Sequence, residues 1–260
     1  MQDTAARQLA LLKHATRANR MLAVMPKDAL ERLLPDIEQV KLVAGDVLSN
    51  VEGGLQHAYF PIDVIVTVLV LTAGRETMKV AVIGREGMTG VPILMGNASP
   101  HRSLVVLNNG DAFKIPIAAL KIEFDRNGAV MRLILRFAQT LITQMAQNAV
   151  CSRHHLVEQQ LCTWLLTCMD HMPTGNTLPV TQEIVAGLLG VRREGVTIAA
   201  LKLQRAGLIH YRRGHMSIVD RAGIERQSCE CYGIVKNAYA HVADGPGRNS
   251  ARRAGALSFA

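Results

Sequence analysis

Residues 180–206 read VTQEIVAGLLGVRREGVTIAALKLQRA and carry the strongest pattern in the chain. Thr181 supplies a hydroxyl that suits a helix N-cap, and apolar residues follow it at helical spacing. Gly190 then stops this helix, because glycine adopts the left-handed conformation that a tight turn needs. A second helical pattern follows, with a buried stripe of Val196, Ala199, Ala200 and Leu203. Helix, glycine turn and helix together predict a helix-turn-helix.

The second helix of this pair opens with charged side chains. Arginine can bond a guanine edge through two hydrogens, and glutamate can accept a hydrogen bond from a cytosine amino group. Arg192, Arg193 and Glu194 are thus the residue types that read bases, at the helix end that enters a major groove. An ordinary helical hairpin with a solvated arginine face is the alternative that these residues leave open.

Two short β-type runs after the second helix favour DNA binding over that alternative. Leu208–Tyr211 and Met216–Val219 flank a glycine-containing loop, Arg212 to His215, which predicts a hairpin. A hairpin behind a recognition helix forms a wing, whose arginine tip can contact phosphate. Residues 173–217 carry six cations and two anions, a net charge of +4 that suits a polyanionic partner.

The run from Thr181 through the hairpin resembles the C-terminal winged helix of the Crp/Fnr family of transcription regulators. The resemblance places Arg193 and Glu194 on the family's base-reading arginine–glutamate pair. Ile198 stands where some members carry a further base-contacting arginine, so the target sequence of those members does not carry over. The residues expected to contact DNA are Thr181, Gln182, Arg192, Arg193, Glu194, Thr197, Lys202 and Arg213.

The resemblance also implies an order of domains, with which the rest of the chain is compatible. Short β-branched runs between Glu38 and Pro116, separated by glycine and polar turns, predict a barrel or a β-roll. We therefore expect an α+β fold with a cyclic-nucleotide-binding-like β-roll (a double-stranded β-helix), a long dimerisation helix and a winged helix-turn-helix. The expected segments are a leader helix at 1–20, the β-roll sensor at 21–125, the dimerisation helix and hinge at 126–153, the DNA-binding domain at 154–235 and a basic disordered tail at 236–260.

Apolar residues repeat at steps of three and four between residues 127 and 148, which predicts a long helix. This seam consists of Val130, Leu133, Ile134, Phe137, Leu141, Ile142 and Met145. We expect it to pack against its twin in a homodimer, although a core helix of a single domain would show the same pattern. The predicted hinge is Cys151-Ser152-Arg153, and Trp164 is expected in the core of the next helix, at 155–172.

Cyclic-nucleotide binding is a family function that the residues of this chain do not support. Members that bind such a nucleotide use a glutamate for the ribose hydroxyl and an arginine–serine pair for the phosphate. Arg102 and Ser103 match that pair and are the candidate effector-binding residues. Val91 stands at the glutamate position and accepts no hydrogen bond, and Pro92 removes a backbone donor beside it. The phosphate cassette is therefore degenerate, and we expect a different small ligand or none, with no identifiable cofactor.

Cysteine and histidine spacing gives no sign of a metal site. The iron–sulfur branch of the family needs several cysteines near the N-terminus, and the first cysteine here is Cys151. Cys229-Glu230-Cys231 is a C-x-C without a partner pair, and His154-His155 reads as a solvated helix start. Four ligands at zinc or cluster spacing are not evident, so no metal site is expected.

Composition and motifs narrow the remaining classes. The 260 residues carry a net charge of +8, and 49% are hydrophobic, which is enough for folded cores. Five cysteines without a disulfide framework fit the cytoplasm, and the longest apolar run, of about ten residues, is too short to cross a membrane. The sequence shows no nucleophile–base set and no phosphate-binding loop, so an enzyme is not expected.

We therefore expect a cytoplasmic, homodimeric transcription regulator that binds double-stranded DNA and no membrane, with RNA polymerase as a further candidate partner. Each recognition helix is expected to enter a major groove, with the two half-sites about one helical turn apart. The alternative is a nucleotide- or small-ligand-binding sensor whose main output is not DNA binding, which only Arg102 and Ser103 favour.

Overall fold

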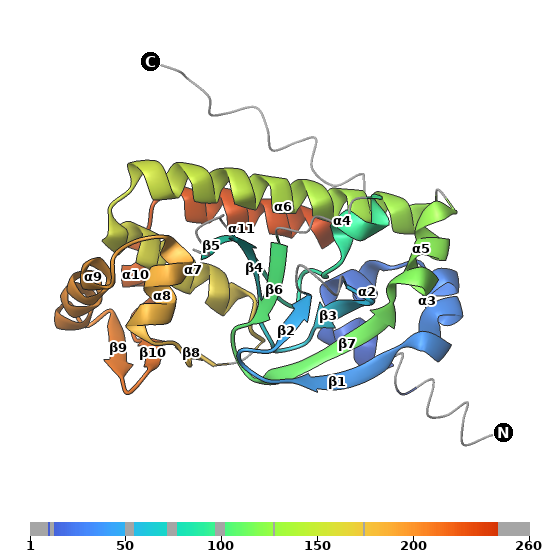
Figure 1. The fold of residues 1–260 in the computed structure, drawn as a ribbon, viewed down its shortest axis with the longest axis horizontal. Coiled ribbons are helices and arrows are strands. Elements are labelled where there is room, and N and C mark those ends of the chain that lie inside the picture. The colour runs from blue at the N-terminus through green and yellow to red at the C-terminus, as the bar shows by residue number, and fades with distance from the viewer. Residues whose placement is uncertain are drawn as a thin grey trace, which may run out of the picture.

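The computed structural model of the chain has a β-roll, a long helix along one side and a helical C-terminal domain with a small sheet (Figure 1). This is the α+β architecture that the sequence predicts. The structure describes residues 10, 13–49, 55–71, 77–96, 102–126, 128–173 and 175–243. Most of the predicted leader helix before residue 13, and the tail after residue 243, lie outside the described residues.

The described residues between 38 and 116 contain seven strands, arranged in two sheets. One sheet has the order β1-β7-β3 and the other β2-β6-β4-β5, and every pairing is antiparallel. The strands are β1 (Glu38–Leu42), β2 (Val47–Ser49), β3 (His57–Pro61), β4 (Val66–Leu71), β5 (Thr77–Ile83), β6 (Arg102–Val106) and β7 (Gly110–Pro116). The β-branched runs thus form the predicted roll, because residues alternating along each strand can line its interior.

Short helices flank the roll. They are α2 (Arg20–Val24), α3 (Lys27–Leu33), the 3-10 helix η1 (Leu34–Asp36), α4 (Val91–Leu94) and α5 (Ile117–Asp125). Residues 13–18 are also helical, and the fully buried Asn19 separates them from α2. Its side-chain oxygen accepts hydrogen bonds from two backbone N–H groups of α2, and its amide donates to the carbonyl oxygens of Pro61 and Gly87 at 2.9 and 3.0 Å. Asn19 therefore fastens the N-terminal helices to the roll.

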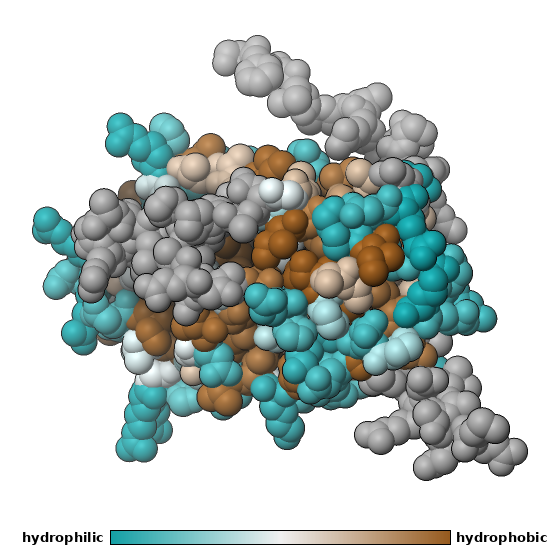
Figure 2. Space-filling model, turned by 45° about the vertical axis from the view of Figure 1, so that its right-hand side comes forward, coloured by the Kyte–Doolittle hydropathy of each residue, from teal (hydrophilic) through white to brown (hydrophobic). Residues whose placement is uncertain are grey.

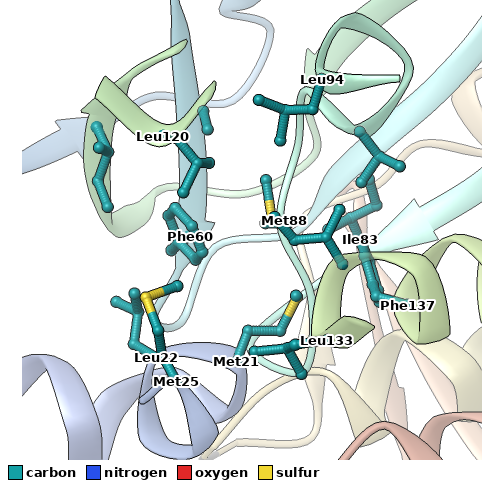
Figure 3. Packing of buried hydrophobic residues seen from close by; sticks show 14 of the residues in the cluster. Met21, Leu22, Met25, Phe60, Ile83, Met88, Leu94, Leu120, Leu133 and Phe137 are labelled. Carbon is teal, nitrogen blue, oxygen red and sulfur yellow. The ribbon is translucent and has the colours of Figure 1, made fainter. Parts of the chain in front are cut away.

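Apolar side chains from these helices, the strands and the long helix fill the interior of the roll, as Figure 3 shows. The labelled side chains are Met21, Leu22, Met25, Phe60, Ile83, Met88, Leu94, Leu120, Leu133 and Phe137. Gly87 lies so close to Phe137 that a Cβ at Gly87 would stand 2.4 Å from the phenyl ring. The side chains at this position are closely packed, so enlarging or truncating one of them should lower the free energy of unfolding by roughly 1–5 kcal/mol.

The long helix α6 (Ala129–His154) runs along one side of the molecule (Figure 1). Most of the seam predicted to face a second copy is buried inside its own chain: Val130, Leu133, Ile134, Phe137 and Leu141. The prediction that these residues form the dimer contact is therefore wrong. The core-helix alternative describes them correctly, because the roll and the C-terminal helix α11 (Glu230–Ala243) cover this face.

The face of α6 that its own chain leaves exposed carries another stripe, which shares only Ile142 with the predicted seam. Its members follow one another at alternating steps of three and four: Arg132, Leu135, Gln139, Ile142, Ala146, Ala149 and Arg153. Leu135 and Ile142 are 38% and 57% exposed. Figure 2 shows apolar surface alternating with polar surface along the upper edge of the molecule, where α6 lies in Figure 1.

Helix α11 corrects the predicted start of the disordered tail, because residues 236–243 are helical. One face of α11 is buried at helical spacing through Val235, Tyr239 and Val242. The Tyr239 hydroxyl donates to the carbonyl oxygen of Val82 at 2.9 Å, and the Thr140 hydroxyl donates to that of Ala238 at 3.1 Å. The chain therefore returns from the C-terminal domain and packs along α6 beside the roll.

The predicted hinge at Cys151-Ser152-Arg153 is also wrong, since these three residues belong to the last turns of α6. The break falls at His155 and Leu156, whose backbones are extended. There the Gln159 side chain accepts a hydrogen bond from the N–H of Leu156 at 3.2 Å and starts α7 (Val157–Asp170). A side-chain cap at the third helical position can begin a helix without a glycine or proline before it.

The C-terminal domain packs α7 against a helix-turn-helix, a three-stranded sheet and a short helix. The further elements are β8 (Thr177–Leu178), α8 (Gln182–Leu189), α9 (Arg193–Arg205), β9 (Ile209–Arg212), β10 (His215–Ile218) and α10 (Arg221–Gln227), with the sheet order β8-β10-β9. Trp164 is 2% exposed in its core, as predicted. Ile65, Val82 and Leu107 of the roll belong to the same apolar cluster, so this domain is docked on the roll. Among the described residues, no helix has both the length and the apolar content to cross a bilayer.

Candidate DNA interface

The helix-turn-helix is formed by α8, a glycine turn and α9, as the sequence predicts. The Thr181 hydroxyl accepts a hydrogen bond from the N–H of Ile184 at 3.2 Å and caps α8. Gly190 ends α8 with a φ of 68°, a backbone conformation that residues with a Cβ atom rarely adopt. The stripe of Val196, Ala199, Ala200 and Leu203 is buried and holds α9 against the rest of the domain.

The charged start of α9 is exposed. Arg192 is the N-cap residue, and Arg193 and Glu194 follow in the first turn. The Arg193 Nε lies 3.8 Å from a carboxylate oxygen of Glu183 on α8, and the two side chains are 65% and 74% exposed. Ion pairs as exposed as this one contribute little to folding stability, so the Arg193 guanidinium can leave Glu183 and bind another acceptor at little cost.

Two further predicted residues contact each other across the helix pair. The Thr197 hydroxyl donates to the side-chain oxygen of Gln182 at 2.7 Å. The backbone N–H of Gln182 donates in turn to the hydroxyl of Tyr211 on β9, at 3.3 Å. Gln182 and Thr197 therefore fix α9 relative to α8 and the hairpin, which orients the charged first turn.

Lys202 lies apart from this group. Its Nζ is 3.4 Å from a carboxylate oxygen of Glu158, which places it on the side of α9 that faces α7. Ile198 and Leu201 occupy the exposed face of the helix instead, at 57% and 46% exposure. Sequence reasoning did not include Leu201 because its position on the exposed face depends on how α9 is turned against the domain.

The predicted wing is present, with β9 and β10 joined by a tighter turn than the predicted four-residue loop. Arg212 pairs with His215, so only Arg213 and Gly214 form the turn. Their φ values of 51° and 76° are both positive, as in the type I′ turn that joins closely twisted strands. Arg213 is exposed at the tip, beyond the end of the sheet.

The candidate effector residues of the roll are adjacent in β6. The hydroxyl of Ser103 donates to the carbonyl oxygen of Ser49 in β2 at 3.3 Å, so it is engaged within the sheet. Arg102 pairs with Val70 through its backbone, and its side chain lies outside the described residues. Met88 and Val91, from the region corresponding to the phosphate cassette, are buried in the core. Apolar side chains thus occupy the part of this region that the structure describes, and Val91 offers no acceptor for a ribose hydroxyl.

Glu86, which follows β5, joins the roll to the C-terminal domain. One carboxylate oxygen lies 2.5 Å from Nδ1 of His171, at the end of α7, and the other lies 3.6 Å from Nε of Arg20. Burial raises the pKa of Glu86, but the hydrogen bond and charge of His171, together with the charges of Arg20 and Arg85, outweigh burial and lower it. A cavity of about 230 Å³ lies at this junction, lined by these groups and by α11.

Sequence reasoning missed a second group of chemically active side chains. Cys151, His155, Cys229 and Cys231 lie together where α6 ends and α11 begins, a grouping of four potential metal ligands that their spacing along the sequence does not make evident. The hydrogen bond from Cys151 lowers the pKa of Cys229, against the effect of burial, and burial raises the pKa of Cys231. The C-x-C run was the available signal, but its partners lie more than 70 residues earlier in the chain.

The fold and this interface define a winged helix-turn-helix protein with a cyclic-nucleotide-binding-like β-roll. Residues 159–227 match the family model described as the Crp-like helix-turn-helix domain. A comparison with curated protein sequences finds no match.

Solved structures similar to this one include several transcription regulators. One is a putative regulator of the Crp/Fnr family from Eubacterium rectale (16% identity, 78% of this chain and 94% of that chain covered, TM-score 0.61). Another is FixK2 from Bradyrhizobium japonicum (11% identity, 74% and 98% covered, TM-score 0.63). A third is the c-di-GMP-responsive global regulator CLP from Xanthomonas campestris (15% identity, 75% and 100% covered, TM-score 0.58).

Residues 159–227 thus belong to the Crp-like helix-turn-helix domain family, and the chain has the fold of the Crp/Fnr transcription regulators. The resemblance found in the sequence is confirmed.

Proposed function

We propose that this protein is a homodimeric transcription regulator that places the first turns of α9 in the major groove of DNA. The observation that carries the proposal is the exposure of Arg193 and Glu194 at the start of a rigidly oriented helix in a Crp-like helix-turn-helix domain. Helix α9 has 13 residues, about 20 Å, which is long enough to lie across the groove. Side chains near its N-terminus would then meet base edges.

The neighbouring predicted residues have supporting roles in this proposal. Thr181 lies exposed at the N-terminus of α8, where backbone N–H groups and the helix dipole favour binding of a phosphate. Arg213 at the wing tip would contact the backbone beside the groove. Gln182 and Thr197 would act mainly by orienting α9, because they already bond each other. Lys202, paired with Glu158, would contribute at the edge of the interface.

A selection of bound DNA from a random pool tests base reading. We expect wild-type protein to enrich a pseudo-palindrome with half-sites about one helical turn apart. Arg193→Ala should lose about 1–3 kcal/mol at one base pair of each half-site and relax the preference there. Arg205→Ala, in the last turn of the same exposed helix, is the matched control and should keep the preference. A uniform loss of affinity across all sequences in Arg193→Ala would contradict direct reading by this side chain.

The homodimer part of the proposal is supported by the exposed stripe on α6. Its alternating steps of three and four residues are the spacing of a two-stranded coiled coil, and it extends over about 32 Å from Arg132 to Arg153. Ile142 lies in the middle with more than half of its surface exposed. Ile142→Glu should therefore yield monomers in sedimentation experiments. Ala129→Glu adds the same charge at the first residue of α6, before the stripe begins and about 20 Å along the helix from Ile142, and should leave the dimer intact.

The junction between roll and C-terminal domain supports control by a sensor. Glu86, Arg20 and His171 meet there beside a cavity of about 230 Å³, which suits a small polar ligand. This cavity also favours the second candidate function, a small-ligand sensor with an output other than DNA binding. Failure to enrich any DNA sequence, combined with a thermal shift on addition of a small anionic metabolite, would support that second candidate.

Two further parts of the proposal concern the setting of this activity. RNA polymerase is the partner on which such a regulator would act. The five cysteines are free thiols in the structure, which favours a reducing compartment such as the cytoplasm.

A further inference from the structure

Three cysteines and one histidine converge where the long helix ends. Cys151 lies in the last turn of α6, His155 is the residue at which α6 stops, and Cys229 and Cys231 flank the first residue of α11. Their ligand atoms all lie within 4.8 Å of one another. Cys151 and Cys229 are separated by 3.5 Å between their sulfur atoms, and Cys231 Sγ lies 3.7 Å from Nδ1 of His155.

These separations fit the shell of a single tetrahedral ion. Zinc–sulfur bonds of ~2.3 Å and zinc–nitrogen bonds of ~2.0 Å place neighbouring ligand atoms about 3.5–3.8 Å apart. The Cys151–Cys229 and Cys231–His155 pairs already have about this spacing, and a limit of 4.8 Å on the other separations leaves only a small inward movement. A cluster of several iron atoms holds its ligands farther apart than one ion does, so this group is too compact for a cluster.

The surroundings of the four ligands are those that metal sites use. Nε2 of His155 lies 3.2 Å from a carboxylate oxygen of Glu230, so its N–H can donate a hydrogen bond to Glu230. In that tautomer the lone pair of Nδ1 is available on the side of the cysteines. The Thr163 hydroxyl lies 3.1 Å from Cys229 Sγ, where it can donate to a thiolate. Lys79 is buried near Cys151, and the two side chains line a small cavity of about 30 Å³ together with Cys231.

We propose that Cys151, His155, Cys229 and Cys231 bind one Zn²⁺ ion in a tetrahedral Cys3His site. Three thiolates and a neutral imidazole satisfy the preference of zinc for sulfur and nitrogen donors. On binding, the protons that the thiols still carry pass to solvent, and no electron is transferred. The site then has a net charge of −1.

The position of this zinc site gives it a structural role at the break between α6 and α7. Among the described residues, the ligands come from the end of α6, from the break and from the start of α11. One ion would therefore link the long helix, the origin of the helix-turn-helix domain and the returning C-terminal helix. It would hold the orientation of α7 relative to α6 more firmly than the thiol contacts alone.

Metal titration of the full-length, reduced protein tests the proposal directly. Co²⁺ is the spectroscopic probe, because tetrahedral coordination by thiolates gives intense visible absorption and sulfur-to-metal charge-transfer bands. We expect one Co²⁺ per chain, displaced by one Zn²⁺. Trp164, the single tryptophan of the chain, lines the cavity with Cys151 and Cys231, so its fluorescence should change over the same titration.

Variants assign the ligands. Cys229→Ala and His155→Ala should each weaken Zn²⁺ binding by more than about 100-fold, and Glu230→Gln by about 10–100-fold through loss of the histidine partner. Cys168→Ala is the matched control, since it removes an equally buried cysteine of α7 outside the group. Glu230 is exposed, so its variant keeps the test valid if a cysteine variant fails to fold.

Three results would overturn the proposal. One is a Co²⁺ spectrum without thiolate charge-transfer bands. Another is Zn²⁺ affinity that is the same in wild type, His155→Ala and Glu230→Gln. The third is a resting Cys151–Cys229 disulfide that, once reduced, leaves a protein without metal uptake. DNA binding is not needed for any of these measurements, so the zinc site and the proposed regulator function can fail independently.

Discussion

Gly84→Ala is the substitution from which we expect the clearest effect on the contact between the two domains. Gly84 follows β5 and lies against His171 at the end of α7. A Cβ at this position would stand 2.2 Å from the His171 Cβ and 3.0 Å from its backbone oxygen. Neither atom is the free end of a flexible side chain, so the backbone of one domain must move. Overpacking of this kind costs typically about 1–3 kcal/mol.

Gly187→Ala is the matched control for this substitution. Gly187 lies within α8, and a Cβ there would meet nothing within 4 Å. Alanine is favoured over glycine inside a helix by about 0.8–1 kcal/mol, so this variant should be more stable than wild type. The same chemical change, one added methyl group, is thus expected to have opposite signs at the two positions.

Urea unfolding followed by the fluorescence of Trp164 measures both variants. With a slope of about 3 kcal/mol/M for a chain of this size, the midpoint of Gly84→Ala should fall by about 0.3–1 M. The midpoint of Gly187→Ala should rise by about 0.3 M. A Gly84→Ala midpoint equal to or above that of wild type would refute the close contact between β5 and α7.

Three further predictions concern the junction, the wing and the helix cap. The pKa of Glu86 in the folded protein is lowered from 4.5, so its contribution to stability is present above pH 4.5 and is lost as the pH falls through the lower folded value. Glu86→Gln should therefore flatten the dependence of unfolding free energy on pH in this acidic range. An unchanged dependence would contradict the ion pairs of Glu86 at the domain junction. Arg213→Asn keeps a residue that tolerates positive φ and removes the charge, so the salt dependence of DNA binding should decrease by about one unit of slope with sequence preference intact, whereas altered preference would indicate base reading. Thr181→Ala should destabilise the domain by about 0.5–2 kcal/mol through loss of the α8 cap, while Thr181→Ser should retain most of it; equal stability of the two variants in urea would show that the cap is not needed.

The helix-turn-helix was predictable because its signals are local. Thr181 and Gly190 act on backbone groups within a few residues of themselves, and the stripe of α9 repeats within a single helix. The same holds for the strands of the roll, whose β-branched runs are separated by turns. The exposure of the charged residues at the start of α9 was predictable in the same way, because they fall outside the buried stripe of that helix.

The predictions that failed required knowledge of what covers each helix. An apolar seam on α6 is the same pattern whether a second copy or its own roll buries it, and only the position of α11 and the roll shows that the chain buries it itself. The hinge was misplaced because the cap of α7 comes from Gln159, three residues inside the helix. Residues 236–243 of α11 were assigned to the tail because the apolar face of this helix is short and its burial depends on packing against α6 and the roll.

The local pattern of residues by itself therefore determined the class of fold, the helix-turn-helix and the wing of this protein. Tertiary structure alone decided which face of α6 is free, how Glu86 meets His171, and that cysteines near residues 151 and 230 share one site. The physical reason is that capping, periodicity and turn formation act over a few residues. Contacts between distant segments depend on the whole packing of the chain, which spacing along the sequence does not encode.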